Sequence, residues 1–293
     1  MDAADTTSPR LAAALRDGAR TLDAAGVPDP MVDVELLAGH VLGVGRGAVQ
    51  AAALRGDPLP AEDGAALAAL VARRARREPL EHLTGTAPFR HLELAVGPGV
   101  FVPRPETEVV AQLAIDALAA VPMPRPRAVD LGTGSGAIAL AMATEVPNAE
   151  VWAVERSPEA YAWTQRNAAR YGGANAHLVL GDLADALPEL DGTVDVVASN
   201  PPYVPDDAIP RDPEVRLFDP PQALYGGADG LDVVRVLSRV GLRLARPGGV
   251  IVIEHGEWQG APIRDVLTGD GWRAAATHPD LTLRDRATTA IRP

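Results

Sequence analysis

Residues 128–136 read Ala-Val-Asp-Leu-Gly-Thr-Gly-Ser-Gly and give the clearest structural signal in the chain. A short apolar segment followed by closely spaced glycines is typical of a buried strand that turns tightly toward a helix, because glycine adopts backbone conformations that other residues disfavour. The glycines also let the backbone approach a ligand closely. We therefore expect a strand at 128–131, a loop at 132–136 and a helix after it.

Beyond this unit, apolar segments of strand length alternate with helical stretches. Such alternation predicts an α/β fold with a mostly parallel sheet and helices on both of its faces. Two segments near the C-terminus, 272–277 and 287–291, are predicted to add an antiparallel edge to this sheet. The parallel strands are predicted at residues 128–131, 150–154, 177–180, 194–199 and 250–253.

The first part of the chain is predicted to be a small helical domain. Leu11 and Leu15 fall on one face at helical spacing, and residues 29–30 (Asp-Pro) are a second helix start signal. A third helix is predicted at 60–77. Its last five residues, 73–77, read Arg-Arg-Ala-Arg-Arg. Two interpretations of this basic segment are open, a solvated helix end, where cations suit the helix dipole, and a basic contact surface.

A β-hairpin is predicted between the helical and the α/β parts of the chain. Residues 89–96 roughly alternate in polarity, Gly97-Pro98-Gly99 favours a turn, and 100–102 is apolar again. The domain boundaries that follow are a helical domain at 1–84, a hairpin linker at 85–103 and an α/β domain at 104–293.

Composition excludes several classes of protein. The 293 residues include no cysteine, so disulfides and thiolate chemistry are excluded and no metal site is expected. The net charge of −12 argues against stable nucleic-acid binding, which relies on basic side chains. No apolar run of about 18 residues is present, and the N-terminus lacks a signal-peptide pattern. We expect a cytoplasmic protein without a membrane segment.

Polar residues follow four consecutive predicted strands, at the point where each strand ends. The glycine loop at 132–136 follows the first, Glu155 ends the second, Asp182 follows the third and Asn200 the fourth. Ligands of open parallel sheets bind beyond the carboxyl ends of the strands. These four positions together therefore predict one site, which any one of them alone would support only weakly.

The glycine loop and two acids suggest a nucleoside-containing ligand. Gly132, Gly134 and Ala137 satisfy the G-x-G-x-x-G/A fingerprint of dinucleotide-binding loops. Glu155 lies 19 residues after Gly136, where a carboxylate can accept both hydroxyl hydrogens of a ribose. This ribose is common to NAD and to S-adenosylmethionine, and an exposed loop acid is the alternative. Asp182 either accepts from an adenine amino group or caps the residues after it.

The tetrad Asn200-Pro201-Pro202-Tyr203 indicates the chemistry. The prolines stiffen the backbone and contribute no N–H. The Asn200 side-chain oxygen and the Pro201 carbonyl can then accept both hydrogens of one NH₂ group, while Tyr203 stacks on the planar group that carries it. A planar amide nitrogen is a poor nucleophile, and two acceptors can hold it in line with a methyl donor. A simple turn is the alternative interpretation.

With these motifs, the chain resembles the Rossmann-like S-adenosylmethionine-dependent methyltransferases, and more narrowly the release factor glutamine N5-methyltransferases of the PrmC/HemK family. The likeness includes Pro-Leu-Glu-His-Leu-Thr-Gly at 79–85, Phe-Val-Pro-Arg-Pro-Glu-Thr-Glu at 101–108 and Ala-Leu-Tyr-Gly-Gly-Ala-Asp-Gly-Leu-Asp at 223–232. Three positions depart from the family pattern. Glu155 stands where Asp is usual, Leu183 stands where some members carry an aromatic residue, and Asp219 precedes Pro220 where Glu is more usual.

The resemblance implies functional roles for individual residues. It implies acceptor contacts from Asn200, Pro201, Pro202 and Tyr203. Because the predicted hairpin ties the helical domain to the catalytic domain, we expect the helical domain to be a substrate-recognition domain that orients the protein substrate. The implied contacts to S-adenosylmethionine come from Gly132, Thr133, Gly134, Ser135, Gly136, Glu155, Asp182, Leu183, Asn200, Phe101 and Arg104.

The implied activity is methyl transfer from S-adenosylmethionine to the glutamine side-chain nitrogen N5 in the GGQ motif of class I peptide chain release factors, which modulates translation termination. A glutamine methyltransferase acting on a ribosomal protein and a nucleic-acid amino methyltransferase of the adenine N6 type are the alternatives. An NAD dehydrogenase would leave the tetrad unexplained. The intact tetrad also argues against a non-catalytic binding module.

Overall fold

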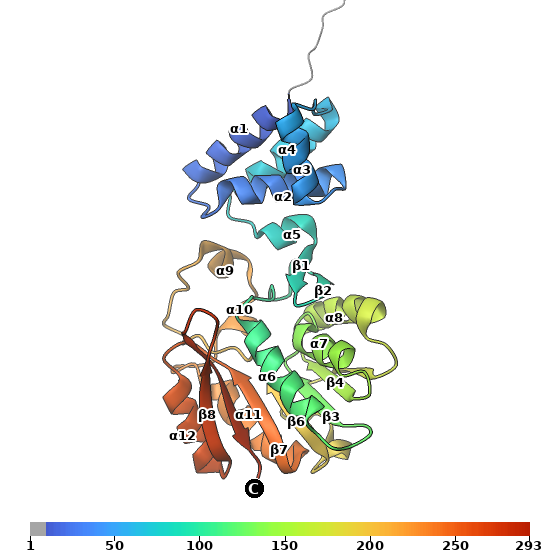
Figure 1. Cartoon of the computed structure of the whole chain (residues 1–293). Coiled ribbons are helices and arrows are strands. Elements are labelled where there is room, and N and C mark those ends of the chain that lie inside the picture. Colours follow the sequence, from blue (N-terminus) through green and yellow to red (C-terminus); the bar gives the residue numbers. More distant parts are fainter. Residues whose placement is uncertain (1–9) are drawn as a thin grey trace, which may run out of the picture. The chain divides into compact units, whose positions relative to one another are not determined.

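The computed structural model describes residues 10–293 of the chain (Figure 1). These residues form two compact units. The helical unit comprises the described residues up to Gly85 together with Arg211–Phe218, and the sheet unit comprises Thr86–Pro210 and Asp219–Pro293. The chain therefore leaves the sheet unit after Pro210 and returns to it at Asp219. The sequence instead predicts an uninterrupted domain at 104–293.

The helical unit is built on apolar side chains that recur at helical spacing. Its helices are α1 (Leu11–Ala24), α2 (Pro30–Leu42), α3 (Arg46–Arg55), α4 (Ala61–Arg74), α5 (Leu80–Thr84) and α9 (Pro213–Phe218). In α1, Leu11, Leu15 and Leu22 are buried because their spacing places them on one face. The sequence does not predict α3. Of the residues in α3, all of them described, only Val49 is buried, so the helix carries no amphipathic pattern.

The basic segment at the end of α4 belongs to a buried ionic cluster of Asp33, Arg74, Arg77 and Glu214. Arg74 is only 6% exposed, and it donates from Nε to Asp33 Oδ2 at 2.7 Å and from Nη1 to Glu214 Oε1 at 2.6 Å. Arg77 donates from Nε and Nη2 to the same Glu214 carboxylate at 2.8 and 2.6 Å. Both sequence interpretations of this segment are therefore wrong for Arg74 and Arg77, because these side chains are withdrawn from solvent and paired with Glu214 of the same unit.

The ionic cluster explains why Arg211–Phe218 belongs to the helical unit. Burial opposes ionisation of Glu214, but hydrogen bonds from Arg77 and Arg74 outweigh it and hold the pKa of this carboxyl at about 2. The carboxylate is therefore charged at neutral pH and bound to two guanidinium groups of the helical unit. Since Glu214 lies in the first turn of α9, these ion pairs fasten α9 to the unit.

The sheet unit contains a seven-stranded sheet, which confirms the predicted fold class. Its strands are β3 (Arg127–Leu131), β4 (Glu150–Glu155), β5 (Ala176–Leu180), β6 (Val194–Ser199), β7 (Ala245–Glu254), β8 (Arg273–Pro279) and β9 (Asp285–Ile291). They lie in the order β5-β4-β3-β6-β7-β9-β8. The first five are parallel, and β9 pairs antiparallel with β7 and β8, as the two C-terminal segments predict.

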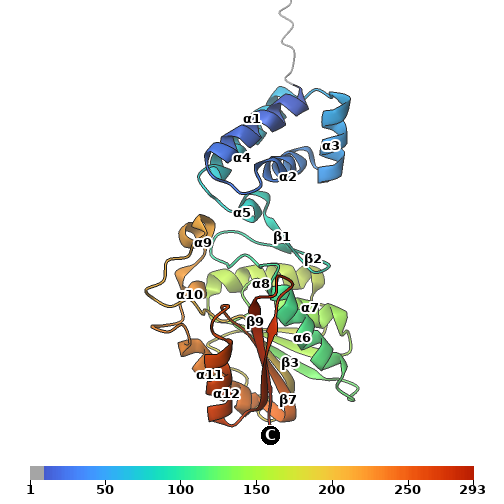
Figure 2. The same ribbon diagram turned by 60° about the vertical axis from the view of Figure 1, so that its left-hand side comes forward.

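Helices cover both faces of the sheet (Figures 1 and 2). Helices α6 (Thr107–Ala119), α7 (Ala137–Glu145) and α8 (Pro158–Tyr171) cover one face, and α11 (Asp232–Leu244) and α12 (Gly260–Asp270) cover the other. Consecutive residues of a strand point to opposite faces of the sheet. Ala128 therefore packs in the cluster under α6 and α7, while Val129 packs under α11. This two-sided burial explains the continuous apolar runs of the strands.

The predicted hairpin exists, but its turn lies at a different position. Its strands are β1 (Thr86–Phe89) and β2 (Leu92–Ala95), so the hairpin reverses at Arg90 and His91, while residues 97–99 form a separate turn after β2 in which the Val100 N–H donates to the Gly97 carbonyl. Arg90 adopts a left-handed backbone with φ 53°, and its N–H donates to Glu108 Oε1 at 2.8 Å. Gly97 is needed for another reason. A Cβ there would lie 2.6 Å from the indole of Trp163.

Within residues 10–293, none of the helices combines the length and the apolar character that spanning a bilayer requires.

Candidate active site

The carboxyl ends of four neighbouring strands bring together the polar positions that the sequence indicates. Glu155 is the last residue of β4 and pairs in register with Leu180, the last residue of β5. On the other side, the hydroxyl of Ser199 at the end of β6 donates to the carbonyl of Leu131 at the end of β3, at 2.6 Å. Adjacent strands lie about 4.8 Å apart. The loop after Leu131 and the tetrad that starts at Asn200 are therefore neighbours.

The glycine loop presents open backbone at this edge. Gly132 and Gly134 have φ values of 77° and 58°, and a Cβ on either would meet no protein atom within 4 Å. The N–H groups of Gly132 and Thr133 both donate to the Val154 carbonyl at 2.9 Å, which holds the start of the loop against β4. The space beside both glycines is thus available to a ligand, as a loop that approaches a ligand closely requires.

Helix α8 holds the second half of the loop. The hydroxyl of Thr164 donates to the Gly134 carbonyl at 2.6 Å, and the Asn167 amide donates to the Ser135 carbonyl at 2.9 Å. Gly136 precedes α7 with φ 88°. Side chains of a neighbouring helix therefore fix the loop before any ligand binds, which lowers the conformational cost of binding.

Asp130 is a buried acid directly beneath the loop. Its Oδ2 accepts from the Thr133 hydroxyl at 2.6 Å and from the Ala139 N–H at 3.1 Å. Its Oδ1 has no hydrogen-bond partner among the described residues. Burial raises the pKa of this carboxyl to about 7. An unpartnered oxygen beside an open loop is suited to a donor from a ligand.

Glu155 binds the glycine loop with one oxygen and the start of α8 with the other. Oε2 accepts from the Gly134 N–H at 2.9 Å, and Oε1 accepts from the Ser157 N–H at 2.8 Å. The residue is 8% exposed, so the alternative of an exposed loop acid is wrong. Each carboxylate oxygen has a second lone pair. The carboxylate can therefore accept from ligand hydroxyls while it continues to hold the loop.

Asp182 and Leu183 lie next to Glu155. The N–H of Gly181 donates to the Glu155 carbonyl at 2.9 Å, so these residues follow β5 at the same edge. Asp182 is exposed, and its Oδ1 accepts from the Ala184 N–H at 2.9 Å. Asp182 thus stabilises its own turn, and its carboxylate also remains accessible. Leu183 packs against the core under α11.

Arg104 contacts both Phe101 and Asp219, the acid that stands where Glu is more usual in the family. Its guanidinium lies 5.2 Å from the centre of the Phe101 ring, and Nη2 donates to Asp219 Oδ2 at 2.8 Å. The shorter acid at 219 therefore still reaches the arginine. Val100 and Val102, on either side of Phe101, pack with Ala160 in the first turn of α8. A role for Phe101 and Arg104 in lining a cofactor pocket stays a prediction.

The backbone of the tetrad is packed against the glycines of residues 226–230. A Cβ on Gly226 would lie 2.4 Å from the Pro202 carbonyl oxygen, and one on Gly230 would lie 2.2 Å from the Tyr203 carbonyl oxygen. Gln259 donates from Nε2 to the same Tyr203 carbonyl at 2.9 Å. The glycines in the motif at 223–232 are thus required because only they allow this close approach.

We expect Gly230→Ala to destabilise the sheet unit by about 2–4 kcal/mol, because left-handed strain at φ 74° adds to overpacking against Tyr203. Urea unfolding followed by tryptophan fluorescence measures this, since Trp152, Trp163, Trp258 and Trp272 all lie in the sheet unit. Gly271→Ala is the matched control, because it has φ 109° and no atom within 4 Å. Equal losses in the two variants would contradict the close-approach argument.

The side chain of Asn200 is held by groups that the sequence does not single out. Asn200 Nδ2 donates to the Thr107 hydroxyl oxygen at 3.3 Å. Glu254, the last residue of β7, lies beside Asn200 because Ile253 pairs in register with Ser199, and both Thr107 and Asn200 lower the pKa of its carboxyl. Thr107 and Glu254 are 3% and 1% exposed. The amide nitrogen of Asn200 therefore faces a buried carboxyl, and its oxygen is left for another donor.

Sequence reasoning gives no individual role in the site to Asp130, Thr107 or Glu254, although Asp130 begins the cluster that contains the glycine loop and Thr107 lies in the motif at 101–108. For the two acids a signal exists. Each directly follows or interrupts an apolar strand segment, where burial of a charge is costly unless it has a purpose. Thr107 lies in the motif at 101–108, but the motif does not reveal its partner, because the contact with Asn200 spans 93 residues and depends on the packing of α6 beside β6 and β7.

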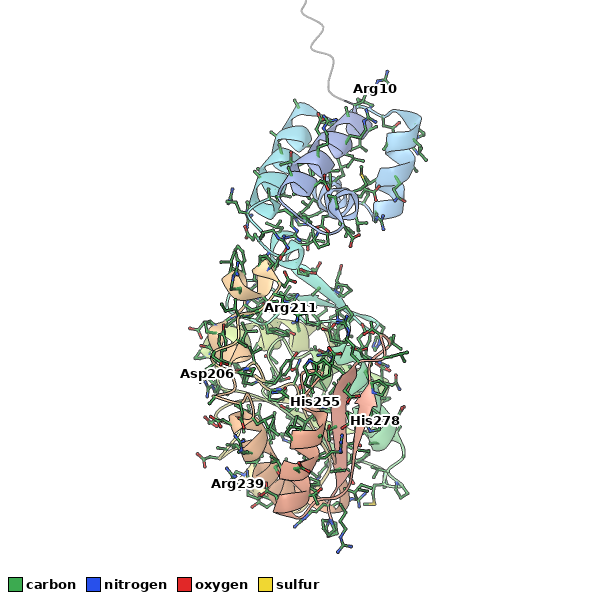
Figure 3. All side chains as sticks on the ribbon, turned by 90° about the vertical axis from the view of Figure 1, so that its left-hand side faces the viewer. Arg10, Asp206, Arg211, Arg239, His255 and His278 are labelled. Carbon is green, nitrogen blue, oxygen red and sulfur yellow. The ribbon has the colours of Figure 1, made fainter. Side chains whose placement is uncertain are left out.

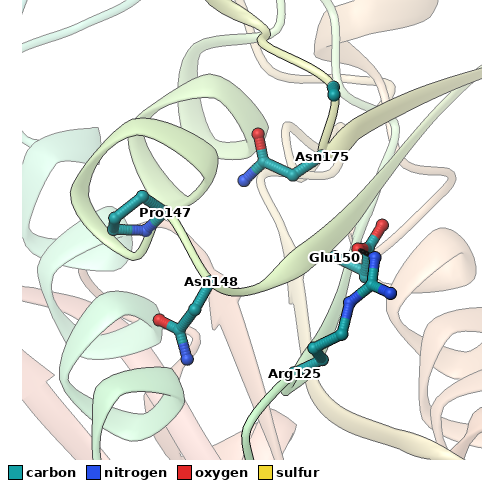
Figure 4. A pocket seen from close by; sticks show the side chains of 6 residues that line it. Arg125, Pro147, Asn148, Glu150 and Asn175 are labelled. Atoms are coloured by element: carbon teal, nitrogen blue, oxygen red, sulfur yellow. Dashed lines mark hydrogen bonds and ion pairs between the residues drawn. The ribbon is translucent and has the colours of Figure 1, made fainter.

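A pocket of about 300 Å³ lies away from these residues (Figure 4). It is lined by Arg125, Pro147, Asn148, Glu150, Ala174 and Asn175. Glu150 is the first residue of β4, whereas Glu155 is its last, so this pocket lies at the amino ends of the strands. Arg125 and Glu150 form an ion pair there. We assign no part of the candidate active site to it.

Comparison with known proteins identifies the family. Residues 13–85 match the PrmC N-terminal domain, and residues 91–219 match the methyltransferase small domain. The chain is 49% identical to the release factor glutamine methyltransferase of Streptomyces coelicolor, over 96% of this chain and 97% of the relative. The chain belongs to the release factor glutamine methyltransferase family. It is therefore a methyltransferase, and the resemblance drawn from the sequence motifs is confirmed.

Two further comparisons show the range of this family and its fold. The chain is 39% identical, over 97% of its length and 96% of the relative, to the 4-amino-L-phenylalanine/4-methylamino-L-phenylalanine methyltransferase of Streptomyces pristinaespiralis. Among solved structures, a methyltransferase from Pyrococcus furiosus superposes with a TM-score of 0.53 at 20% identity, covering 75% of this chain and 98% of that one. This structural likeness shows the Rossmann-like fold alone.

Proposed function

We propose that this family member transfers a methyl group from S-adenosylmethionine to the side-chain nitrogen N5 of the glutamine in the GGQ motif of class I peptide chain release factors. By this reaction, in the cytoplasm, it modulates translation termination. The observation that carries the proposal is the held amide of Asn200, whose nitrogen faces Thr107 and Glu254 and whose oxygen is left to accept from an NH₂ group. The family membership supports the same substrate.

The residues at the strand ends fit S-adenosylmethionine. The open backbone beside Gly132 and Gly134 leaves room for a ligand, and the unpartnered Oδ1 of Asp130 suits a donor such as an ammonium group or the water bound to it. Glu155 would accept from the ribose hydroxyls, and Asp182 with Leu183 would contact the adenine. When bound, S-adenosylmethionine would supply a methyl group activated by a positively charged sulfur.

The chain's own residues would position the acceptor nitrogen. An amide nitrogen is a weak nucleophile because its lone pair is delocalised into the carbonyl group. Asn200 Oδ1 and the Pro201 carbonyl would accept its two hydrogens, and the Tyr203 ring would stack on the amide plane. Such positioning can supply on the order of 7–11 kcal/mol of the barrier, and acceptors aimed at developing positive charge add electrostatic stabilisation.

An aromatic amine is the second candidate acceptor. The relative from Streptomyces pristinaespiralis is named for methylation of 4-amino-L-phenylalanine, which also carries an NH₂ group on a planar system. Two acceptor oxygens and a stacking ring suit both nitrogens. The alignment with this relative covers 97% of the chain and so includes the helical unit, but its identity of 39% is lower than the 49% to the Streptomyces coelicolor release factor glutamine methyltransferase, which favours the protein substrate. We propose that the helical unit recognises and orients this protein substrate.

The test is incubation with labelled S-adenosylmethionine and either purified release factor, release factor with its GGQ glutamine changed to alanine, or 4-amino-L-phenylalanine. We expect label in the intact factor alone. Mass spectrometry of the digested factor then locates the added methyl group. Label in the amino acid and none in the factor would overturn the proposed substrate. Label in neither would contradict both candidate acceptors, and the labelled protein would then be identified in a cell lysate.

We expect Glu155→Ala to weaken binding of S-adenosylhomocysteine by roughly 1.5–3 kcal/mol, the range for a lost hydrogen bond to a charged group. The loop would also loosen, since Glu155 accepts from the Gly134 N–H. Titration calorimetry measures the affinity. Glu189→Ala, at an exposed acid of the same unit, is the control. Unchanged affinity in a folded Glu155→Ala protein would remove this residue from the binding site.

A further inference from the structure

Glu254 is a buried acid whose position the known features of the site do not explain. It ends β7, pairs in register with Ala287 of β9, and is 1% exposed. One of its oxygens, Oε2, has no hydrogen-bond partner among the described residues. Burying a carboxyl that is only partly satisfied costs stability. Its retention at the end of an apolar strand therefore points to a function.

The contacts of Glu254 lead to the side chain of Asn200. Ile253 pairs in register with Ser199, so Glu254 lies beside Asn200 at the ends of their strands, and both Thr107 and Asn200 lower the pKa of its carboxyl. The Thr107 oxygen in turn accepts from Asn200 Nδ2 at 3.3 Å. Because the Thr107 oxygen accepts from Asn200, its hydroxyl hydrogen is available to donate to Glu254. The Asn200 amide, the Thr107 hydroxyl and the Glu254 carboxyl therefore form one polar cluster.

An ionised carboxyl decides which way the Asn200 amide faces. A carboxylate can only accept hydrogen bonds, whereas an amide has a donating and an accepting end. With the carboxylate and the Thr107 oxygen on one side, the NH₂ end of Asn200 must face them. A flipped amide would place two acceptor oxygens against each other. Oδ1 is therefore directed to the opposite side, where an acceptor of hydrogen bonds is needed.

We propose that Glu254 is a positioning residue, which acts through Thr107 and Nδ2 of Asn200 to present Asn200 Oδ1 to the NH₂ group of the methyl acceptor. The statement about the acceptor rests on the proposed function. The orientation of the Asn200 amide does not, because it follows from contacts within the protein alone.

The charges around Glu254 come from several elements. Arg286 on β9 attracts the carboxylate, and Glu106 at the start of α6 repels it. Arg286 also lies near Tyr203 and Asp280, with Nε 3.5 Å from Asp280 Oδ2. The neighbouring His255 (Figure 3) contacts the Gly256 carbonyl through Nδ1 and the Thr288 hydroxyl through Nε2, and burial lowers its pKa. It is therefore neutral near pH 7.

The arrangement makes the orientation of Asn200 dependent on pH. Burial raises the pKa of Glu254 to about 7. Below this pH the carboxyl carries a proton, becomes a donor, and loses its preference for the NH₂ end of Asn200. Above it the carboxylate holds the amide in the proposed orientation. Methyl transfer that depends on Glu254 must therefore rise as the pH increases through about 7.

Two substitutions test the inference by kinetics. Glu254→Gln keeps the shape and one acceptor oxygen but removes the charge, and Glu254→Met removes every acceptor. We expect single-turnover methylation of release factor at pH 8 to fall about 10-fold and about 100-fold respectively. Affinity for S-adenosylhomocysteine should stay unchanged in both. Glu257→Gln, at an exposed acid three residues along the chain, is the control and should match wild type.

The pH profile separates positioning from a structural role. The ratio of the wild-type rate to the Glu254→Gln rate should increase from pH 6 to pH 8, because only the wild type has a group at 254 that titrates there. Asp130, whose pKa is also raised to about 7, titrates in both proteins, so its effect on the rate cancels in the ratio. A constant ratio, or equal rates at every pH, would overturn the proposal.

A second measurement does not need a methyl acceptor. The Asn200 NH₂ signals in a ¹⁵N–¹H spectrum are assigned by their loss in Asn200→Asp. We expect them to shift between pH 6 and pH 8 in wild type and to stay constant in Glu254→Gln. Signals that do not shift in wild type would overturn the inference. If they shift but wild type does not methylate release factor, the proposed function fails while the orientation by Glu254 stands.

Discussion

Asn200→Ala is expected to lower the single-turnover rate of methyl transfer about 10²–10³-fold, the loss typical of removing one group that stabilises a transition state. The substitution deletes the acceptor Oδ1 but leaves the prolines at 201 and 202 and the packing of Gly230 against the Tyr203 carbonyl. The backbone of the turn should therefore persist. Binding of S-adenosylhomocysteine should change little, because the Asn200 side chain is turned toward the acceptor in our proposal.

Asn200→Asp is the sharper comparison. It keeps an acceptor oxygen but places a second carboxyl against the buried Glu254, where the NH₂ group of Asn200 now lies. Two like charges this close disfavour each other's ionisation. We expect a rate between those of wild type and Asn200→Ala. An alanine variant within about tenfold of wild type, far short of the loss expected for such a group, would show that something else holds the nitrogen.

Glu214→Ala is expected to destabilise the helical unit by about 3–5 kcal/mol, the cost of leaving buried charges without their partner. Glu214 accepts hydrogen bonds from Arg74 at 2.6 Å and from Arg77 at 2.8 and 2.6 Å. Without it Arg74 keeps only Asp33 as an acidic partner among the described residues. The segment Arg211–Phe218 then loses the ion pairs that fasten it to the unit.

Two spectroscopic signals separate the units in this experiment. Far-UV circular dichroism reports helix loss, and tryptophan fluorescence reports only the sheet unit, which holds all four tryptophans. We expect Glu214→Ala to shift the first signal to lower urea and leave the second nearly unchanged. Glu62→Ala, at an exposed acid of α4, should shift neither. Coincident shifts of both signals in Glu214→Ala would show that the ion pairs stabilise more than the helical unit.

The same variant tests the role proposed for the helical unit. Only nine residues separate Tyr203 from the start of α9 at Pro213, and backbone hydrogen bonds hold the chain as far as Asp206, so release of α9 frees the segment that follows Asp206. We expect weaker methylation of intact release factor with unchanged affinity for S-adenosylhomocysteine. If Glu214→Ala methylates the factor at the normal rate while α9 is released, α9 has no part in substrate recognition.

The sequence by itself determined the parts of this protein that depend on local chemistry. The apolar strands, the glycine loop, the acid at Glu155 and the tetrad at Asn200 are each readable because their pattern lies within a few consecutive residues. Parallel strands place their carboxyl ends at one edge of a sheet, so the neighbourhood of these positions also follows from the strand pattern. The hairpin turn was misplaced because the glycine and proline at 97–99 form a second turn, after β2, where Gly97 also packs against Trp163.

Only the tertiary structure decided the contacts between residues far apart in the chain. The partner of Arg74 lies 140 residues away at Glu214, and the hydroxyl that holds Asn200 lies 93 residues away at Thr107. No local pattern predicts such pairs. The residues that flank an arginine do not show whether the fold will bury it against an acid from elsewhere in the chain. A carboxyl such as Glu254 acquires its orienting role only when packing removes water and leaves it facing one amide.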